Sequence, residues 1–473
     1  MQIGEVNDDK LKEACGVLGI YNSCEDAGLG RTAYYGLYAL QHRGQESAGI
    51  AVTSGNGIKY HKDMGLVSEV FNDEIIDGLC GKIAIGHVRY STSGSSTLIN
   101  AQPLVVKYKK GSLAVAHNGN LINAAEVKQE LEEQGAVFQT TVDSEVIAFL
   151  IAREQSEDIS KAAIECAKKI KGSYAIVMMT ENELVGMRDP KGIRPLSIGK
   201  LNGSYVIASE SCAFDTIGAE FIRDVEPGEI VIVNEDGLKS FKFNDDNISS
   251  LCIFEFVYFA RPDSRIEGKS VHMARMEAGR QLAKESPVEA DLVIGVPDSG
   301  TVSAMGYAEA SGLPFGIGLI KNRYIGRTFI QPSQESRIIG VKLKLNVVKD
   351  VIKDKRVVMV DDSIVRGTTS GQIVRLLKES GAKQVHVRVS SPPIMHSCYF
   401  GIDTSARKEL IGARQKVDEI RQHIGADSLN YLSLEGLIKS TGISEQKFCS
   451  GCFCGKYPLE IPMESKEHLF EKR

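Results

Sequence analysis

Short apolar runs, bounded by glycine or polar turns, recur along the first half of the chain. Five of these runs have the length and composition of β-strands, at residues 16–21, 49–52, 83–90, 112–117 and 174–180. Residues 126–134 and 143–154 instead repeat apolar residues at the spacing of an amphipathic helix. The pattern predicts stacked β-sheets with helices.

The second half has a different pattern, in which predicted strands and helices alternate. The predicted strands lie at residues 291–296, 356–360 and 384–389, and the predicted helical stretches end at Ser311 and Ser380. Such alternation is typical of βαβ units and predicts an α/β unit with a central parallel sheet. Ligands of these sheets bind at the carboxyl ends of strands, so the loops at 297–300 and 361–369 are the predicted binding loops.

A polar, turn-rich segment at residues 243–250, FNDDNISS, separates the two patterns. The length of 473 residues suggests two to four domains, at roughly 100–200 residues each. We expect a first domain over residues 15–247 and a second over residues 248–473.

Composition narrows the class of protein. Apolar residues make up 42% of the chain and charged residues 25%, which are ordinary globular values. The formal net charge of −5 argues against binding nucleic acid through a basic surface. No apolar stretch approaches the roughly 18 residues of a membrane span. The hydrophilic N-terminus is unlike a secretion signal, so we expect a cytoplasmic protein with no membrane partner.

The segment RVVMVDDSIVRGTTS, residues 356–370, combines a buried strand with a loop that opens a helix. The strand delivers Asp361 and Asp362 to its carboxyl end, where carboxylates suit a hydroxylated sugar or Mg²⁺. The loop that follows carries small and hydroxyl residues, which suit a phosphate at a helix N-terminus. The plainer alternative is an acidic turn before a capped helix.

Two neighbouring segments would suit a pyrophosphate group. The turn VPDSG, residues 296–300, offers backbone amides and the Ser299 hydroxyl. Residues 321–346 carry six basic side chains against the single acid Glu335, and basic loops supply charge-assisted hydrogen bonds to polyanions. These basic residues are Lys321, Arg323, Arg327, Arg337, Lys342 and Lys344. The alternative for this segment is a solvated loop.

The 356–370 string resembles the signature of type I phosphoribosyltransferases, which bind phosphoribosyl pyrophosphate (PRPP). The resemblance implies that Asp361 and Asp362 hold the ribose hydroxyls and Mg²⁺, with Ser299 as a further metal ligand. It also implies that the basic loop closes over PRPP. The implied PRPP-binding residues are Asp361, Asp362, Ser363, Arg366, Gly367, Thr368, Thr369, Lys321 and Arg327. Gly300 departs from the pattern, because many relatives have a serine or threonine there.

Cys15 begins the strand CGVLGIYN, where a cysteine is ordinarily a core residue. Three further strings, HRGQ (residues 42–45), HVRYST (87–92) and HNGN (117–120), change that interpretation. With Cys15 they resemble the class II glutamine amidotransferase domain, an N-terminal nucleophile hydrolase with an αββα sandwich. The resemblance implies a fold of α+β class here, followed by the α/β phosphoribosyltransferase domain.

This resemblance also implies the residues of a glutamine site. Cys15 would be the nucleophile, and Asn118 with the Gly119 N–H would form the oxyanion hole. Arg89, with Thr92 nearby, would pair with the glutamine carboxylate, and Asp143 with its ammonium group. Taken singly, Arg89 and Asp143 have the alternative of a surface ion pair.

The nucleophile of this family must be the first residue of the mature protein, because its thiol uses the free α-amino group as a base. That group has a pKa near 8, whereas an amide nitrogen is not basic. Residues 1–14 are therefore predicted to be a propeptide removed before Cys15. The alternative is a flexible N-terminal tail.

The remaining cysteines divide into two groups. At about 2% of the chain, ten cysteines are too few for a disulfide framework. Cys24, Cys80, Cys166 and Cys212 are predicted to be inert core residues. The string KFCSGCFCGKYP contains Cys449, Cys452 and Cys454, and a C-x-x-C alone suits a redox pair or half a zinc site equally.

Both halves, in this order, resemble the family of glutamine phosphoribosylpyrophosphate amidotransferases, in its propeptide-bearing, iron–sulfur branch. The resemblance implies a [4Fe–4S] cluster on Cys252, Cys398, Cys449 and Cys452, with Cys454 as an alternative to Cys452. It also implies Mg²⁺, glutamine and PRPP as substrates and cofactor, inhibition by purine nucleotides, and a homotetramer or homodimer.

Three alternatives remain. Another class II amidotransferase, such as one that makes glucosamine phosphate, would share only the first half of the chain. A non-catalytic PRPP sensor would need a DNA-binding element, and the sequence offers no basic recognition helix. An N-terminal nucleophile acylase or peptidase would have no use for the PRPP loop.

Overall fold

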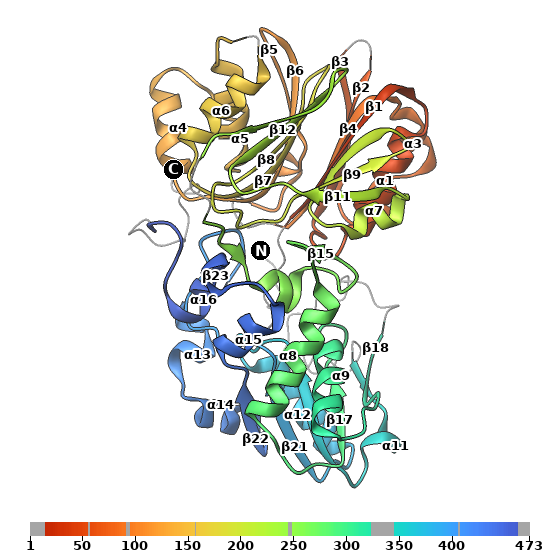
Figure 1. The fold of residues 1–473 in the computed structure, drawn as a ribbon, viewed down its shortest axis with the longest axis vertical. Helices are drawn as coiled ribbons and strands as arrows, with labels where there is room; N and C mark the ends of the chain where they lie inside the picture. The colour runs from red at the N-terminus through yellow and green to blue at the C-terminus, as the bar shows by residue number, and fades with distance from the viewer. Residues whose placement is uncertain are drawn as a thin grey trace, which may run out of the picture.

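The computed structural model describes residues 15–54, 57–90, 95–156, 158–244, 248–322, 345–404 and 407–461. The chain forms two lobes stacked along its long axis (Figure 1). The upper lobe contains the strands up to Lys242, and the lower lobe contains those from Leu251 onward.

Two antiparallel sheets form the upper lobe. The seven-stranded sheet has the order β11 (Glu220–Asp224), β9 (Ser197–Leu201), β10 (Ser204–Ala208), β1 (Gly16–Asp26), β4 (Gly81–Arg89), β2 (Ser47–Ser54), β3 (Gly57–Met64). The six-stranded sheet has the order β13 (Gly237–Lys242), β12 (Glu229–Asn234), β8 (Leu184–Arg188), β7 (Gly172–Met179), β6 (Gly111–Leu121), β5 (Leu104–Tyr108). Their facing sides share one core that includes Val17, Ile85, Ala116 and Val177.

Helices cover the outer face of each sheet, as Figure 1 shows. The first sheet is covered by α1 (Leu29–Ala39), α2 (Val67–Val70), α3 (Asp73–Gly78) and α7 (Cys212–Ile217). The second is covered by α4 (Ala124–Glu133), α5 (Ser144–Arg153) and α6 (Ile159–Lys169). This is the predicted αββα sandwich.

A four-stranded parallel sheet is the centre of the lower lobe. Its order is β17 (Leu292–Gly295), β20 (Arg356–Asp361), β21 (Gln384–Val389), β22 (Ser428–Tyr431). Along β20, Val358 and Val360 face one core, whereas Val357 and Met359 face the other. Both faces of the sheet are therefore buried, as expected for a parallel sheet. The predicted central parallel sheet is confirmed.

Helices pack on both faces of this sheet. One face carries α8 (Val271–Glu285), α9 (Gly300–Ser311) and α15 (Leu434–Thr441), and the other carries α12 (Thr368–Glu379) and α14 (Val417–Ile424). The smaller elements are β18 (Leu319–Lys321), β19 (Leu345–Val347), α11 (Lys349–Ile352) and α13 (Ile411–Arg414). Among the residues described, no helix is long and apolar enough to cross a membrane.

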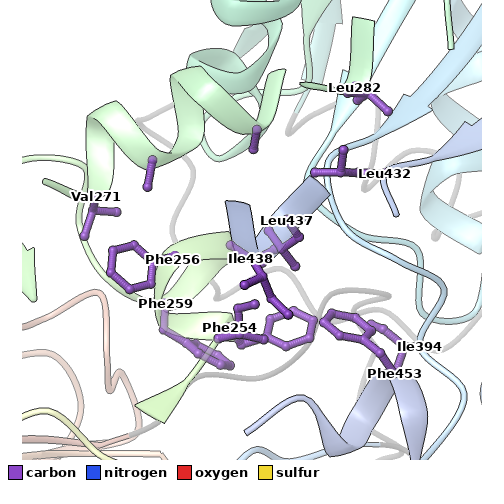
Figure 2. Packing of buried hydrophobic residues seen from close by; sticks show 14 of the residues in the cluster. Phe254, Phe256, Phe259, Val271, Leu282, Ile394, Leu432, Leu437, Ile438 and Phe453 are labelled. Atoms are coloured by element: carbon purple, nitrogen blue, oxygen red, sulfur yellow. The ribbon is translucent and has the colours of Figure 1, made fainter. Parts of the chain in front are cut away.

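The junction between the lobes is built from short elements of the lower lobe. The π-helical turn η2 (Glu255–Phe259) lies beside β14 (Leu251–Cys252), which pairs in parallel with β23 (Phe448–Cys449). The helix α16 (Gly451–Cys454) follows, and the hairpin β15 (Arg265–Ile266)–β16 (Lys269–Ser270) lies nearby. Figure 2 shows the aromatic core beneath the junction, where the rings of Phe254 and Phe453 stack 5.3 Å apart.

Candidate functional site

Cys15 directly precedes β1 and lies against the end of β4. Its thiol donates a hydrogen bond to the carbonyl of Tyr90 (3.3 Å), and the Tyr90 N–H donates one back to the sulfur (3.4 Å). The side chain is buried, and burial raises the pKa of the Cys15 thiol above its usual value. A neutral thiol needs a base before it can act as a nucleophile.

Asn118 and Gly119 lie side by side near the end of β6. The Asn118 side chain is fully buried, and neither its amide nitrogen nor its amide oxygen has a hydrogen-bond partner among the described residues. A Cβ added to Gly119 would lie 2.0 Å from the carbonyl oxygen of Ser173 on β7, so only glycine fits. The strand therefore presents an amide that is available to a ligand.

Arg89 and Asp143 lie close enough to Cys15 for their charges to act on its thiol. Both side chains are buried, so neither forms the surface ion pair that the sequence left open. The Asp143 carboxylate accepts a hydrogen bond from the Leu121 N–H (2.9 Å) and lies 3.6 Å from Nδ1 of His117. Although burial raises the pKa of Asp143, the charge of His117 and these hydrogen bonds lower it below its usual value. Asp143 is therefore ionised at neutral pH.

A hydrogen-bond network beneath β6 was not predicted from the sequence. The His117 N–H donates to the side chain of Gln102 (2.8 Å), whose amide donates to the hydroxyl of Ser144 (3.0 Å). Nδ1 of His117 lies 3.1 Å from the same hydroxyl. On the other side, His87 donates from Nε2 to the His117 carbonyl (3.0 Å) and so joins the two sheets. Both histidines belong to motifs singled out above, but those motifs gave no role for them.

The second group of predicted residues lies at the carboxyl end of β20. Asp361 and Asp362 are both buried there, and Oδ1 of Asp361 accepts a hydrogen bond from the Asp362 N–H (2.9 Å). The Ser363 hydroxyl donates to Oδ1 of Asp362 (2.6 Å), and the Ser299 hydroxyl donates to Oδ2. The structure thus brings the turn after β17 and the loop after β20 to one carboxylate.

The loop from Ser363 to Gly367 ends in the first turn of α12. Gly367 has a φ of +84°, in the left-handed region that favours glycine, and it caps this helix. Thr368 and Thr369 are the first residues of α12, at its N-terminus. Arg366 forms an ion pair with Glu409 (2.7 Å). The loop has the backbone geometry of an anion-binding helix N-terminus.

The turn after β17 lies directly against β20. A Cβ added to Gly300 would come within 2.5 Å of the Val360 carbonyl oxygen, so this turn needs glycine at position 300. The departure from the family pattern at Gly300 therefore has a steric reason. Lys321 at the end of β18 reaches the same turn through an ion pair with Asp298 (3.0 Å).

Three parts of the predicted site lie outside the described residues. They are Thr92, Arg327 with most of the basic loop, and the predicted propeptide 1–14.

The predicted iron–sulfur ligands gather at the junction. Cys252 and Cys449 are direct partners in the β14–β23 pair. Cys252, Cys449 and Cys398 all lie close enough to Cys452 for their charges to act on its thiol, and burial raises the pKa of Cys452 well above its usual value. Among the described residues no three metal-ligating side chains converge on a single ion. A cubane cluster instead spreads its thiolates over several irons.

The other cysteines are more varied than predicted. Cys454 is exposed and donates to the Ser450 carbonyl (3.4 Å). Cys166 and Cys212 are buried, as predicted for core residues. The prediction was wrong for Cys24, which lies exposed near the end of β1, and for Cys80, which is only partly buried. Strand β1 extends beyond the apolar run, so its last residues reach solvent.

Comparison with protein families divides the chain as the structure does. A glutamine amidotransferase domain matches residues 87–216, and a phosphoribosyl transferase domain matches residues 271–391. The first match contains Arg89, Asn118 and Asp143, and the second contains the strand end at Asp361 and Asp362.

Two relatives match this chain over nearly the full length of both domains. The amidophosphoribosyltransferase of Bacillus subtilis is 53% identical over 95% of this chain and 95% of its own. That of Archaeoglobus fulgidus is 53% identical over 96% of this chain and 100% of its own.

Two solved structures extend the agreement to the fold. An allosteric regulatory enzyme of purine biosynthesis superposes with a TM-score of 0.92 at 52% identity, covering 97% of this chain and 99% of that one. A glutamine PRPP amidotransferase from B. subtilis, complexed with ADP and GMP, superposes with a TM-score of 0.90 at 52% identity, covering 95% and 99%. The chain therefore belongs to the amidophosphoribosyltransferase family.

Proposed function

We infer that this chain transfers the amide nitrogen of glutamine to PRPP, forming 5-phosphoribosylamine, glutamate and pyrophosphate. This is the first committed step of purine biosynthesis. The chain matches amidophosphoribosyltransferases over nearly its whole length. The observation that carries the inference is that this one chain contains two separate sites. One is the buried site around Cys15 and Asn118, and the other is the strand end at Asp361 and Asp362.

In the first site, Cys15 attacks the side-chain amide carbon of glutamine. The tetrahedral intermediate places negative charge on the former carbonyl oxygen, which the free amide of Asn118 and the N–H of Gly119 stabilise. The C–N bond then breaks and ammonia leaves, so that a glutamyl thioester remains, which water hydrolyses to glutamate. The positive charge of Arg89 and the negative charge of Asp143 select a free amino acid, and Thr92 is a further proposed glutamine-binding residue.

The high pKa of the buried Cys15 thiol supports the requirement for a local base. We propose that removal of residues 1–14 supplies this base as the α-amino group of Cys15. Intact-mass measurement of the active enzyme tests this step. A mass that begins at Cys15 is expected, and active protein that still carries Met1 would contradict it.

In the second site, Asp361 and Asp362 hold the ribose hydroxyls of PRPP, and residues 363–369 hold its 5-phosphate. Ammonia displaces pyrophosphate from the first carbon of the ribose, and Lys321 and Arg327 bind the departing group. The carboxylates and Ser299 are oxygen donors of the kind that Mg²⁺ prefers, and a bound Mg²⁺ would neutralise charge on pyrophosphate.

For the gathered thiols we propose a structural [4Fe–4S] cluster held by Cys252, Cys398, Cys449 and Cys452. Cys252, Cys398 and Cys452 are buried and Cys449 is partly buried, and all four lie close enough for their charges to interact. Coordination by iron would hold the four side chains as thiolates, despite the burial that raises the pKa values of Cys252, Cys449 and Cys452. The exposed position of Cys454 favours Cys452 as the fourth ligand. Acid-labile sulfide and brown absorbance in anaerobically purified protein are expected, and absence of both would contradict the cluster.

The remaining proposals concern regulation and assembly. The B. subtilis relative that was solved with ADP and GMP supports purine nucleotides as inhibitors of this chain. A homotetramer or homodimer in the cytoplasm remains our expectation from the family resemblance.

The direct test of the proposed reaction is a pyrophosphate-release assay on anaerobically purified protein. Release is expected only when PRPP is present together with glutamine or ammonia. Pyrophosphate release that continues without PRPP, or no release with both substrates present, would contradict the proposed function.

A further inference from the structure

The carbonyl oxygen of Cys15 is held by a charged side chain from the same lobe. Arg43 donates from Nε to this oxygen (3.1 Å), and its guanidinium is fully buried. Although burial lowers the pKa of Arg43, the carboxylates around it raise that pKa above its usual value. The residue that fixes the backbone of the nucleophile is therefore always charged.

One of these carboxylates comes from the other lobe. Glu255, in the π-helical turn η2, accepts two hydrogen bonds from the Arg43 guanidinium, at 2.8 and 3.0 Å. This bidentate pair fixes the orientation of the guanidinium as well as its position. Glu210 of the upper lobe is a second partner and is itself held by His42 and Ser264.

Glu255 is also linked to β7, the neighbour of the strand that carries Asn118 and Gly119. Arg194 donates to Glu255 (3.2 Å) and to the Phe400 carbonyl (2.6 Å), which also accepts from the hydroxyl of Ser173 (2.8 Å). Ser173 lies on β7, directly beside β6. One carboxylate thus connects to both halves of the proposed glutamine site.

The turn that carries Glu255 is rigidly supported. Arg275 of α8 donates to the carbonyls of Phe256 (2.7 Å) and Ala260 (2.8 Å) at the two ends of the turn. Phe254, Phe256 and Phe259 anchor it in the aromatic core of the lower lobe (Figure 2). The carboxylate is therefore a fixed point of the lower lobe.

We propose that Glu255 is a positioning residue of the glutamine site, supplied by the phosphoribosyltransferase lobe, which orients Cys15 through Arg43. The inference rests on the proposed function of Cys15. Glutamine hydrolysis then requires the docked second lobe. The groups expected to bind glutamine, Arg89 and Asp143, belong to the first lobe.

The variant Glu255→Gln tests the proposal, because it keeps the size of the side chain and removes its charge. A displaced nucleophile is expected to lower kcat with glutamine about 100-fold. The KM for glutamine and the ammonia-dependent rate are expected to stay within about twofold, because their binding groups are untouched. The matched control is Glu267→Gln, which removes another cross-lobe ion pair, with Arg188 (2.8 Å), and is expected to leave both rates unchanged.

Two results with Glu255→Gln would overturn the proposal. One is an unchanged glutamine-dependent kcat in folded Glu255→Gln, and the other is an equal loss of both rates, which would indicate a general structural role. If Glu255→Gln does not fold, Glu255→Asp keeps the charge but breaks the bidentate geometry, and about a tenfold loss confined to glutamine is expected. An unchanged kcat in this variant would also overturn the proposal. Wild-type protein without glutamine-dependent activity would instead contradict the proposed function itself.

Discussion

At the scale of single residues, Asn118 is the least satisfied part of the first site. A buried amide without hydrogen-bond partners costs about 1–3 kcal/mol, and protein interiors seldom retain such a group without a use. Both polar atoms of Asn118 are in this state among the described residues. The unsatisfied amide is what an oxyanion site needs before its ligand arrives.

Replacement of this amide should lower the rate with glutamine but not the rate with ammonia. Asn118→Ala is expected to lower glutamine-dependent kcat by about 10²–10³-fold, the usual effect of losing one oxyanion donor. Ammonia-dependent synthesis should be unchanged, as steady-state pyrophosphate release would show. Asn234→Ala is the control, because that side chain pairs with Glu183 in a remote part of the same sheet and should alter neither rate.

His87 gives a residue-scale prediction about stability. Burial lowers the pKa of His87 to about 3, so the folded protein resists protonation that the unfolded chain accepts near pH 6.5. The stability that neutral His87 contributes is complete above pH 6.5 and is lost as the pH falls toward 3.

Between pH 7 and pH 5 this single group should cost the wild type about 2 kcal/mol of unfolding free energy. His87→Gln keeps a donor for the His117 carbonyl and should show a smaller loss, measured by urea unfolding at both pH values. His423→Gln removes an exposed imidazole and should lose as much unfolding free energy between pH 7 and pH 5 as the wild type does. An equal loss of unfolding free energy in all three proteins would refute the assignment of this pH dependence to His87.

At the scale of elements, the second site depends on how closely the turn after β17 lies against β20. The steric limit at Gly300 brings Ser299 to Asp362. Gly300→Ala should push the turn away from the strand end and raise the KM for PRPP by tenfold or more, roughly the effect of 1–2 kcal/mol.

This change should appear with glutamine and with ammonia, because both reactions consume PRPP. Gly78→Ala is the control, since a Cβ there meets no atom within 4 Å. A rise in the KM for PRPP that is absent with ammonia would show that Gly300 does not serve the PRPP site.

The elements themselves were largely predictable from the pattern of apolar residues. The strand predicted at 384–389 matches β21, and the strand predicted at 112–117 is the first part of β6. In the structure β6 continues through Asn118 and Gly119 to Leu121, because pairing with β7 extends regular structure into polar residues. The pattern of apolar residues does not indicate which strands pair, so the ends of strands were predicted least well.

The residues of the two sites were predictable where a motif is local. Asp361, Asp362 and Ser363 are adjacent in the sequence and lie together in the structure. The support of Cys15 was not predictable, because Arg43 and Glu255 are 212 positions apart and no local pattern relates them. Both look like surface charges in the sequence, but both are buried in the structure.

At the scale of the whole molecule, the four gathered thiols tie the C-terminal segment to the start of the second lobe. Cys252→Ser should abolish the proposed cluster and lower the unfolding free energy by several kcal/mol, because cluster binding no longer stabilises the folded state. Loss of acid-labile sulfide and a lower thermal midpoint would be the two readouts. Cys454→Ser is the matched control and should retain both properties.

The central claim is that one chain holds two separable activities, glutamine hydrolysis at Cys15 and nitrogen transfer at the strand end of Asp361. The most direct measurement compares Cys15→Ala with the wild type, using glutamine or ammonia as the nitrogen source and following PRPP-dependent pyrophosphate release. Glutamine-dependent release should disappear, and ammonia-dependent release should remain within about twofold of the wild type. Loss of both activities in a folded variant, or glutamine-dependent release without the thiol, would contradict the account.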